Sequence, residues 1–158
     1  MSRDTWEMNG PRNRVKGLTF EKTVEWACRR QSIKFIRMPM GARPVRGRGG
    51  RPQLIAIKTF LDYILIKDGK SIFLDCKSFE GDSLSYSMLT LHQIHELKDI
   101  QNYGAKAGYL VHHRKSDQVC FYLADKLCDL GPRESISPAA AAFILGSGEL
   151  FDLSVLFS

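Results

Sequence analysis

The sequence predicts a small α/β domain in which a mixed β-sheet is flanked by helices and a basic loop or stalk projects at about residues 40–53. Its 158 residues suffice for one domain with a single core. Segments whose apolar residues recur at helical spacing alternate with short runs that are typical of strands. The stretch at 40–53 interrupts them with four Arg, four Gly and two Pro, a composition that cannot pack a core. This order is typical of a small α/β or α+β domain.

The elements before the basic loop are predicted to be a leader, a helix and a strand. Residues 1–13 are polar, which predicts a flexible leader, and 14–158 is expected to form a single domain. From residue 14 to about 32 the apolar side chains recur on one stripe, so we expect a helix there. Residues 33–38, IKFIRM, follow as a short strand.

Beyond the basic loop the sequence predicts a β-hairpin with strands at 54–67 and 71–77. Asp68-Gly69 between the strands is a strong signal for a two-residue turn. After a polar loop we expect a helix from about Ser87 or Thr90 to Tyr103, which Gly104 ends. The inner stripe of this helix is expected to consist of Leu91, Ile94, Leu97 and Lys98.

The last part of the chain is predicted to complete the sheet. Residues 108–112 and 118–123 are two further strands joined by a polar turn, and AAAAFILG at 139–146 is expected to form a short terminal helix.

The composition restricts the classes of partner and of cellular compartment. The formal charge of +6 and the pI of about 9.3 favour a polyanionic partner, nucleic acid before membrane. The four cysteines are scattered and form no CxxC pair, which argues against a zinc site and against a disulfide-rich secreted domain. The polar N-terminus is no signal peptide, and no apolar run is long enough for a membrane span. We therefore expect a cytoplasmic protein.

Two carboxylates and a lysine stand within the apolar runs of the predicted hairpin, although buried strands favour apolar side chains. Side chains alternate along a strand, so Asp75 and Lys77 are expected to project from one face. Asp62 and Asp75 are equally distant from the centre of the Asp68-Gly69 turn, which predicts that they lie opposite each other.

Two carboxylates this close repel each other, and burying either of them alone is costly. A divalent cation between Asp62 and Asp75 removes the repulsion, and oxygen ligands suit Mg²⁺ or Mn²⁺. Such an ion can polarise a phosphodiester and activate water, while Lys77 would orient or deprotonate the water or stabilise the developing charge. The alternative is that Asp75 and Lys77 form a solvated ion pair on an edge strand.

Four motifs in order resemble a known family. They are GLTFEK with Glu21, FLDY with Asp62, FLDCKS with Asp75 and Lys77, and LHQIHEL with Gln93. Over residues 14–112 this order resembles the RecU-type Holliday-junction resolvases of the PD-(D/E)xK nuclease superfamily. Asp75 stands where the family more often has Glu, and Leu61 stands where it commonly has Thr or Ser. The sequence leaves a bacterial and a phage origin equally open.

The resemblance implies a restriction-endonuclease-like core and a metal-dependent endonuclease that acts as a homodimer on four-way DNA junctions. It implies a metal site of Glu21, Asp62 and Asp75, with Lys77 and Gln93 completing the catalytic set, although Glu25 is as good an acid as Glu21 by composition alone. It also implies that the basic segment is a stalk that grips DNA phosphates. The DNA-binding residues are expected to be Arg43, Arg46, Arg48 and Arg51.

Two other functions remain open from the sequence. One is a less selective nuclease of the same superfamily, of repair or restriction type. The other is a non-catalytic DNA-binding protein that keeps the fold.

Overall fold

The computed structural model describes residues 11–39, 41–57, 60–148 and 150–158, without the side chains of 11–18, 41–43 and 56–57. Its body is a six-stranded sheet in the order β1-β4-β5-β7-β8-β10. The helices are α1 (Pro11–Arg30), α2 (Leu91–Asn102) and α3 (Ala124–Cys128). The strands are β1 (Lys34–Arg37), β2 (Gly41–Arg46), β3 (Pro52–Ile57), β4 (Tyr63–Lys67), β5 (Lys70–Phe79), β6 (Leu84–Ser85), β7 (Lys106–His113), β8 (Gln118–Leu123), β9 (Ser135–Ile136) and β10 (Phe143–Ser147).

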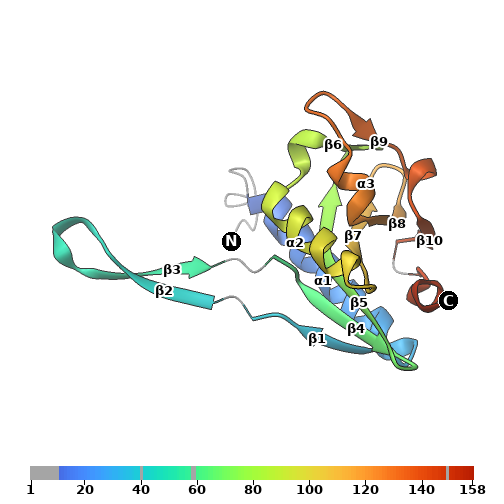
Figure 1. Ribbon diagram of the computed structural model, residues 1–158, viewed down its shortest axis with the longest axis horizontal. Coiled ribbons are helices and arrows are strands. Elements are labelled where there is room, and N and C mark those ends of the chain that lie inside the picture. Colours follow the sequence, from blue (N-terminus) through green and yellow to red (C-terminus); the bar gives the residue numbers. More distant parts are fainter. Residues whose placement is uncertain (1–10, 40, 58–59, 149) are drawn as a thin grey trace, which may run out of the picture.

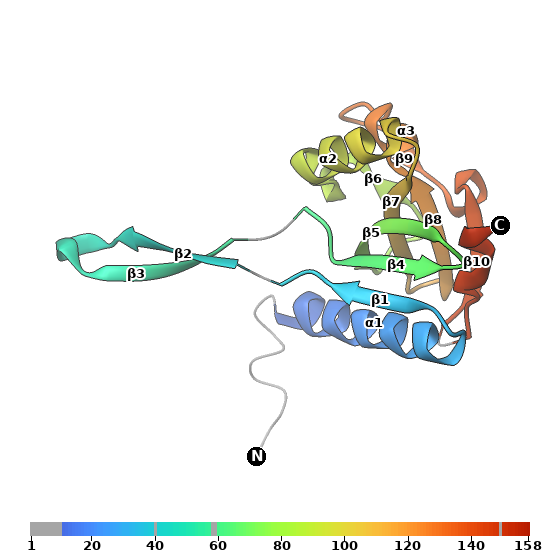
Figure 2. The same ribbon diagram turned by 60° about the horizontal axis from the view of Figure 1, so that its bottom comes forward.

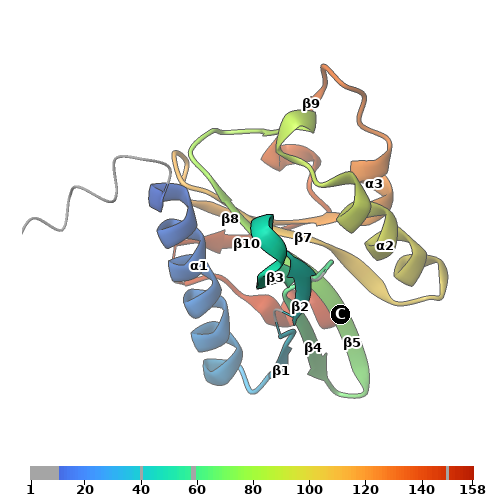
Figure 3. The ribbon, with the colours of Figure 1, turned by 90° about the vertical axis from the view of Figure 1, so that its left-hand side faces the viewer.

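The sheet is mixed and lies between two helical layers, as the sequence predicts. β5 and β7 pair in parallel, whereas the other pairs of neighbours within the sheet are antiparallel. α1 packs on one face, and α2 with α3 packs on the other (Figures 2 and 3). Each face has its own apolar core, because side chains of the central strands alternate between the two layers.

The predicted hairpin is present as β4 and β5. Its ladder ends at the pair Lys67 and Lys70, so Asp68 and Gly69 alone form the turn. Both turn residues have positive φ, 49° and 75°, as a type I′ turn requires.

The basic segment projects as predicted, and it does so as a two-stranded ribbon, which agrees with the expected stalk and not with an unstructured loop. β2 and β3 pair along their whole length and project away from the sheet (Figure 1). At the tip, the Gly47 amide donates to the Arg51 carbonyl at 2.9 Å, and Gly49 and Gly50 take positive φ values there. Local glycines and cross-strand pairing therefore form the ribbon without a core of its own.

The predicted strand at 54–67 is wrong, because this segment contains two separate strands. Pro52–Ile57 belongs to the ribbon, and the sheet strand begins only at Tyr63. The apolar pattern continues across both strands, so it did not reveal the break between them.

Two further predictions about element type or bounds are wrong. AAAAFILG forms a 3₁₀ turn at Pro138–Ala140 and then β10, which pairs antiparallel with β8. Pairing with an open strand edge outweighs the helix propensity of the alanines. The first helix begins at Pro11, before the predicted start at 14; of the expected leader, residues 1–10 lie outside the described residues. No helix in the described part of the chain combines the length and apolar character needed to cross a bilayer.

Candidate active site

The candidate site lies on the face of β5 that α2 covers. Asp75 is fully buried and the Lys77 side chain is 13% exposed, and both project to this face. Cys76 between them packs against the α1 layer instead. The predicted alternation along β5 is therefore correct, and the strand is central in the sheet, not at its edge.

Asp75 and Lys77 form an ion pair within a network of buried polar side chains. Lys77 Nζ lies 2.7 Å from Asp75 Oδ2, and Gln93 Nε2 donates to Asp75 Oδ1 at 3.2 Å. The other end of the Gln93 amide accepts from Lys77 Nζ at 3.2 Å and from the Tyr109 hydroxyl at 3.2 Å. The Gln93 amide thus hydrogen-bonds with Asp75, Lys77 and Tyr109 at the same time.

The electrostatics of this network keep Lys77 charged. Burial alone lowers the pKa of Lys77, but the charge of Asp75 and its hydrogen bond outweigh burial and leave the pKa above its ordinary value. In this arrangement Lys77 is a cation at neutral pH. It therefore suits charge stabilisation better than proton abstraction.

Asp62 lies beside the middle of β5, directly before β4 begins. Its Oδ2 accepts from the Cys76 amide at 2.8 Å, and its own amide donates to the Leu74 carbonyl at 3.0 Å. The β4 ladder stops at Tyr63, so the Asp62 carboxylate takes the position beside β5 where the next strand residue would pair. This places Asp62 next to Asp75 along β5.

Glu21 is held on the α1 side by an arginine that the sequence analysis did not select. Arg37 Nη2, at the end of β1, lies 2.9 Å from Glu21 Oε2. Glu25, one turn later, accepts from the Tyr63 hydroxyl at 2.7 Å and so supports the core. Arg37 Nη1 also lies 3.4 Å from Glu25 Oε1, so the same arginine pairs with both acids.

The Cys76 thiol is affected by the charges of all three candidate metal-binding acids. Burial raises the pKa of the Cys76 thiol well above its ordinary value, and the charges of Asp62, Asp75 and Glu21 raise it further. All three carboxylates therefore act on one buried sulfur. Within the described residues, however, no group of three or more His, Cys, Asp or Glu side chains is arranged to hold a metal ion.

The donor chemistry of the acid pair nevertheless fits a hard divalent cation. Asp62 and Asp75 offer carboxylate oxygens beside the same stretch of β5, and such ligands suit Mg²⁺ or Mn²⁺. The fully buried Asp75 also requires a nearby positive charge, which Lys77 supplies here.

Comparisons with known proteins place this arrangement in a known fold. No protein-family model matches the chain, and no curated protein sequence matches it. The structure of Hjc, a Holliday junction resolvase from the archaeal hyperthermophile Archaeoglobus fulgidus, is similar with a TM-score of 0.55 and 14% sequence identity. The similarity covers 81% of this chain and 93% of the Hjc chain. The chain has the fold of this resolvase. The restriction-endonuclease-like core that the resemblance implies is therefore confirmed.

Tyr109 is the site residue that sequence reasoning missed. It lies on β7 directly beside Asp75 in the parallel ladder, accepts from the Thr90 amide at 3.4 Å and donates to Gln93. Burial raises the pKa of Tyr109, which keeps its hydroxyl protonated as a donor. In the sequence it stands in an apolar run, GYLVH, and nothing local separates it from a core tyrosine.

The predicted DNA-binding arginines all lie on the ribbon, away from the network (Figure 1). Arg46, Arg48 and Arg51 are exposed, and the side chain of Arg43 lies outside the described residues. Leu54, on the same ribbon, is 77% exposed.

Proposed function

We propose that this chain is a metal-dependent, structure-selective DNA endonuclease that resolves four-way (Holliday) junctions by paired phosphodiester hydrolysis. The proposal includes a homodimer, whose two sites would nick opposing strands, acting in the cytoplasm. The fold similarity to Hjc supports it, because that protein is a Holliday junction resolvase.

The observation that carries the proposal is the buried Asp75–Lys77 pair on β5. An ion pair taken out of water stabilises a fold little, and apolar residues of similar size often do so better. A buried pair held by Gln93 and Tyr109 on a central strand is therefore better explained by chemistry than by stability.

The proposed roles follow from the contacts of each side chain. Mg²⁺ or Mn²⁺ would be held by Asp62 and Asp75, with Glu21 in support, and when bound supplies the positive charge that polarises a phosphodiester and lowers the pKa of water. Lys77 stabilises the negative charge that develops on the phosphate oxygens. Gln93 keeps the Lys77 ammonium and the Asp75 carboxylate aligned.

The ribbon supports branched DNA as the substrate. Its exposed arginines can contact phosphates without reading sequence. A narrow projection of two strands suits the open centre of a junction, where a flat surface would not enter.

Cleavage of a synthetic four-way junction with Mg²⁺ and with Mn²⁺, mapped to the nucleotide, tests the proposal. Symmetric nicks on opposing strands are the expected result and indicate both resolution and dimeric action. Equal cleavage of junction, duplex and single strands would replace the proposal with a less selective nuclease. No cleavage of any DNA in either metal would leave a DNA-binding protein.

A further inference from the structure

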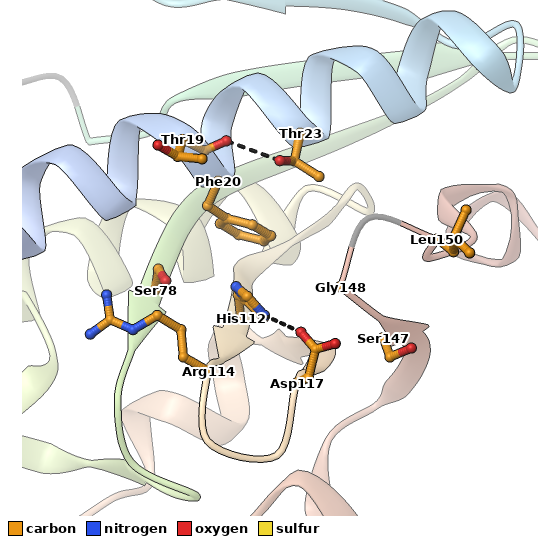
Figure 4. A pocket seen from close by; sticks show the side chains of 10 residues that line it. All are labelled: Thr19, Phe20, Thr23, Ser78, His112, Arg114, Asp117, Ser147, Gly148 and Leu150. Atoms are coloured by element: carbon orange, nitrogen blue, oxygen red, sulfur yellow. Dashed lines mark hydrogen bonds and ion pairs between the residues drawn. The ribbon is translucent and has the colours of Figure 1, made fainter.

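A pocket of about 630 Å³ lies on the α1 face of the sheet, behind the candidate active site (Figure 4). Four parts of the chain bound it: α1, the end of β5, the turn between β7 and β8, and the segment after β10. Its lining residues are Thr19, Phe20, Thr23, Ser78, His112, Arg114, Asp117, Ser147, Gly148 and Leu150. Most of these side chains can make hydrogen bonds, which is unusual for a gap between packed layers.

Ser78 is the first indication that this pocket holds a ligand. It follows Lys77 on β5 and therefore projects to the opposite face, toward α1. Its Oγ is buried, and none of the described residues offers it a hydrogen-bond partner. Buried hydroxyl groups are normally satisfied, so an unsatisfied one at the wall of a pocket indicates a missing partner.

Arg114 supplies a positive charge to the same pocket. Its side chain is only 14% exposed, and its amide donates to the Phe79 carbonyl at 2.8 Å, which fixes it beside the end of β5. Nη2 lies 2.9 Å from Glu80, whose side chain is 75% exposed, so solvent screens the acid more than the arginine. A guanidinium this shielded, close to a hydroxyl, is suited to a phosphate.

His112 lies beside Ser78 in the β5–β7 ladder and is held in a fixed orientation. Its Nε2 lies 2.9 Å from Asp117 Oδ1, and its ring stacks on Phe20 with centroids 5.4 Å apart. Figure 4 shows the imidazole between Phe20 and Asp117, with Ser78 and Arg114 on the same side of the pocket. The Asp117 carboxylate, which also lines the pocket, is thus paired with His112.

We propose that this pocket is a subsite for one phosphate group of a nucleic-acid strand, with the Ser78 hydroxyl and the Arg114 guanidinium as its donors. Ser78 is the residue after Lys77 on β5 but projects to the opposite face of the sheet, so a phosphate bound here is separate from the one at the candidate active site. The assignment to DNA rests on the proposed function, whereas the binding of a phosphate group does not.

The test compares Arg114→Gln with Lys115→Gln, its matched control. Lys115 is the next residue, pairs with exposed Asp82 at 3.3 Å and does not line the pocket, so both changes remove one charge from the same turn. Binding of a DNA junction is measured by fluorescence anisotropy over a salt titration without divalent ions, so cleavage plays no part. Arg114→Gln is expected to weaken binding roughly 10-fold and to reduce the salt slope by about one, and Lys115→Gln to do neither.

Ser78→Ala provides a second variant that does not threaten the fold. Because Oγ has no described partner, its removal should leave the melting temperature unchanged or raise it, while DNA affinity falls roughly threefold or more. Inorganic phosphate, titrated into the wild type and followed by amide NMR, should shift the signals of Ser78 and Arg114.

The outcomes separate this inference from the proposed function. Phosphate-induced shifts together with a selective loss in Arg114→Gln support the subsite even where no DNA is cut. Shifts without any difference in DNA affinity between Arg114→Gln and Lys115→Gln would mean a site for free phosphate and overturn the assignment to a strand. Absence of localised shifts, with equal affinities for both variants, would overturn the subsite altogether.

Discussion

Asp75 is the central residue of the polar network in the candidate site. It is fully buried, and its oxygens face the Lys77 ammonium and the Gln93 amide. Removing one partner of a buried ion pair leaves an uncompensated charge and costs about 3–5 kcal/mol. Variants of this pair therefore need a control for folding as well as for charge.

Asp75→Asn and Lys77→Ala are expected to abolish cleavage, by at least about 100-fold, and to leave junction binding intact. The reason is that, under the proposed function, both side chains would act on the scissile phosphate, whereas the ribbon would provide the binding contacts. Lys77→Met, which keeps the aliphatic stem, controls for packing, and circular dichroism checks the fold of each variant. The exposed pair Asp82 and Lys115 offers matched substitutions, Asp82→Asn and Lys115→Ala, that should cleave normally. Full activity of Asp75→Asn with Mg²⁺ would refute the assigned roles.

His113 predicts how stability depends on pH. Burial lowers the pKa of His113 below its ordinary value of 6.5, although the Gly81 carbonyl and Asp82 oppose this and His112 reinforces it. Nδ1 contacts the Gly81 carbonyl at 3.3 Å and Nε2 contacts the Tyr122 hydroxyl at 2.8 Å, an arrangement that suits the neutral ring. The unfolded chain thus binds a proton at a higher pH than the folded chain does. This contribution to stability is complete above pH 6.5 and is lost as the pH falls below it.

Urea unfolding at about pH 7.5 and about pH 5.5 measures this effect. The free energy of unfolding of the wild type should be lower at the more acidic pH, and the decrease should be smaller for His113→Gln. His95→Gln, at an exposed position on α2, is the control and should behave as the wild type does. An equal loss in His113→Gln and the wild type would assign the pH dependence to other groups.

Sequence reasoning selected the ionisable residues of the candidate site but not the contacts that position them. Asp62, Asp75 and Lys77 could be selected because strand alternation and the turn geometry are local properties. Tyr109 and Arg37 could not, since their roles arise from contacts between β5, α2, β7 and α1 that no local pattern encodes.

The α2 helix shows the same limit for a whole element. The expected inner stripe included Leu91 and Lys98, whereas Leu91 is 43% exposed and the fully buried side chains are Ile94 and Leu97. Gln93 takes the third inward position, because its amide has partners on β5 and β7. A polar residue that is satisfied only by tertiary contacts cannot be assigned to the buried face from hydropathy.

Two leucine-to-alanine substitutions on α2, one at a buried and one at an exposed position, test which face of the helix is buried. Leu97→Ala should lower the free energy of unfolding by about 2–5 kcal/mol, because it leaves a cavity beneath the helix that carries Gln93. Leu91→Ala, on the exposed side, should cost less than about 1 kcal/mol. Chemical denaturation of both variants provides the comparison, and similar losses would contradict the orientation of the helix described above.

The strand pairing of the ribbon and the strand β10 were not predicted, for a related reason. Both depend on pairing with a particular partner strand, which the local sequence pattern does not reveal. The β4–β5 hairpin was predicted because its turn residues and apolar alternation lie within one short segment. Local signals thus predicted the hairpin that carries the acids, while nonlocal pairing determined the rest of the sheet.

At the scale of the whole molecule, the ribbon and the candidate site share one attachment point. The chain leaves the sheet after β1 at Met38, whose amide donates to the Asp62 carbonyl at 2.9 Å, and it re-enters the sheet at Asp62 itself (Figure 2). Under the proposed function, a DNA strand held by the ribbon would therefore be brought toward the part of β5 where Asp62 and Asp75 lie. The proposal thus connects binding and cleavage within one chain.

Replacement of the four ribbon arginines by glutamine, at positions 43, 46, 48 and 51, tests this connection. We expect weaker junction binding and a smaller dependence on salt, with up to about one unit of slope lost for each phosphate contact removed.

The control removes four exposed positive charges at the opposite end of the sheet, by substitution of Arg29, Arg30, Lys34 and Lys70. Both variants change the net charge equally, so a general electrostatic effect would reduce their salt slopes equally. A selective loss in the ribbon variant, measured by fluorescence anisotropy without divalent ions, supports the ribbon as the junction-binding element. Unchanged binding across the salt titration would rule this role out.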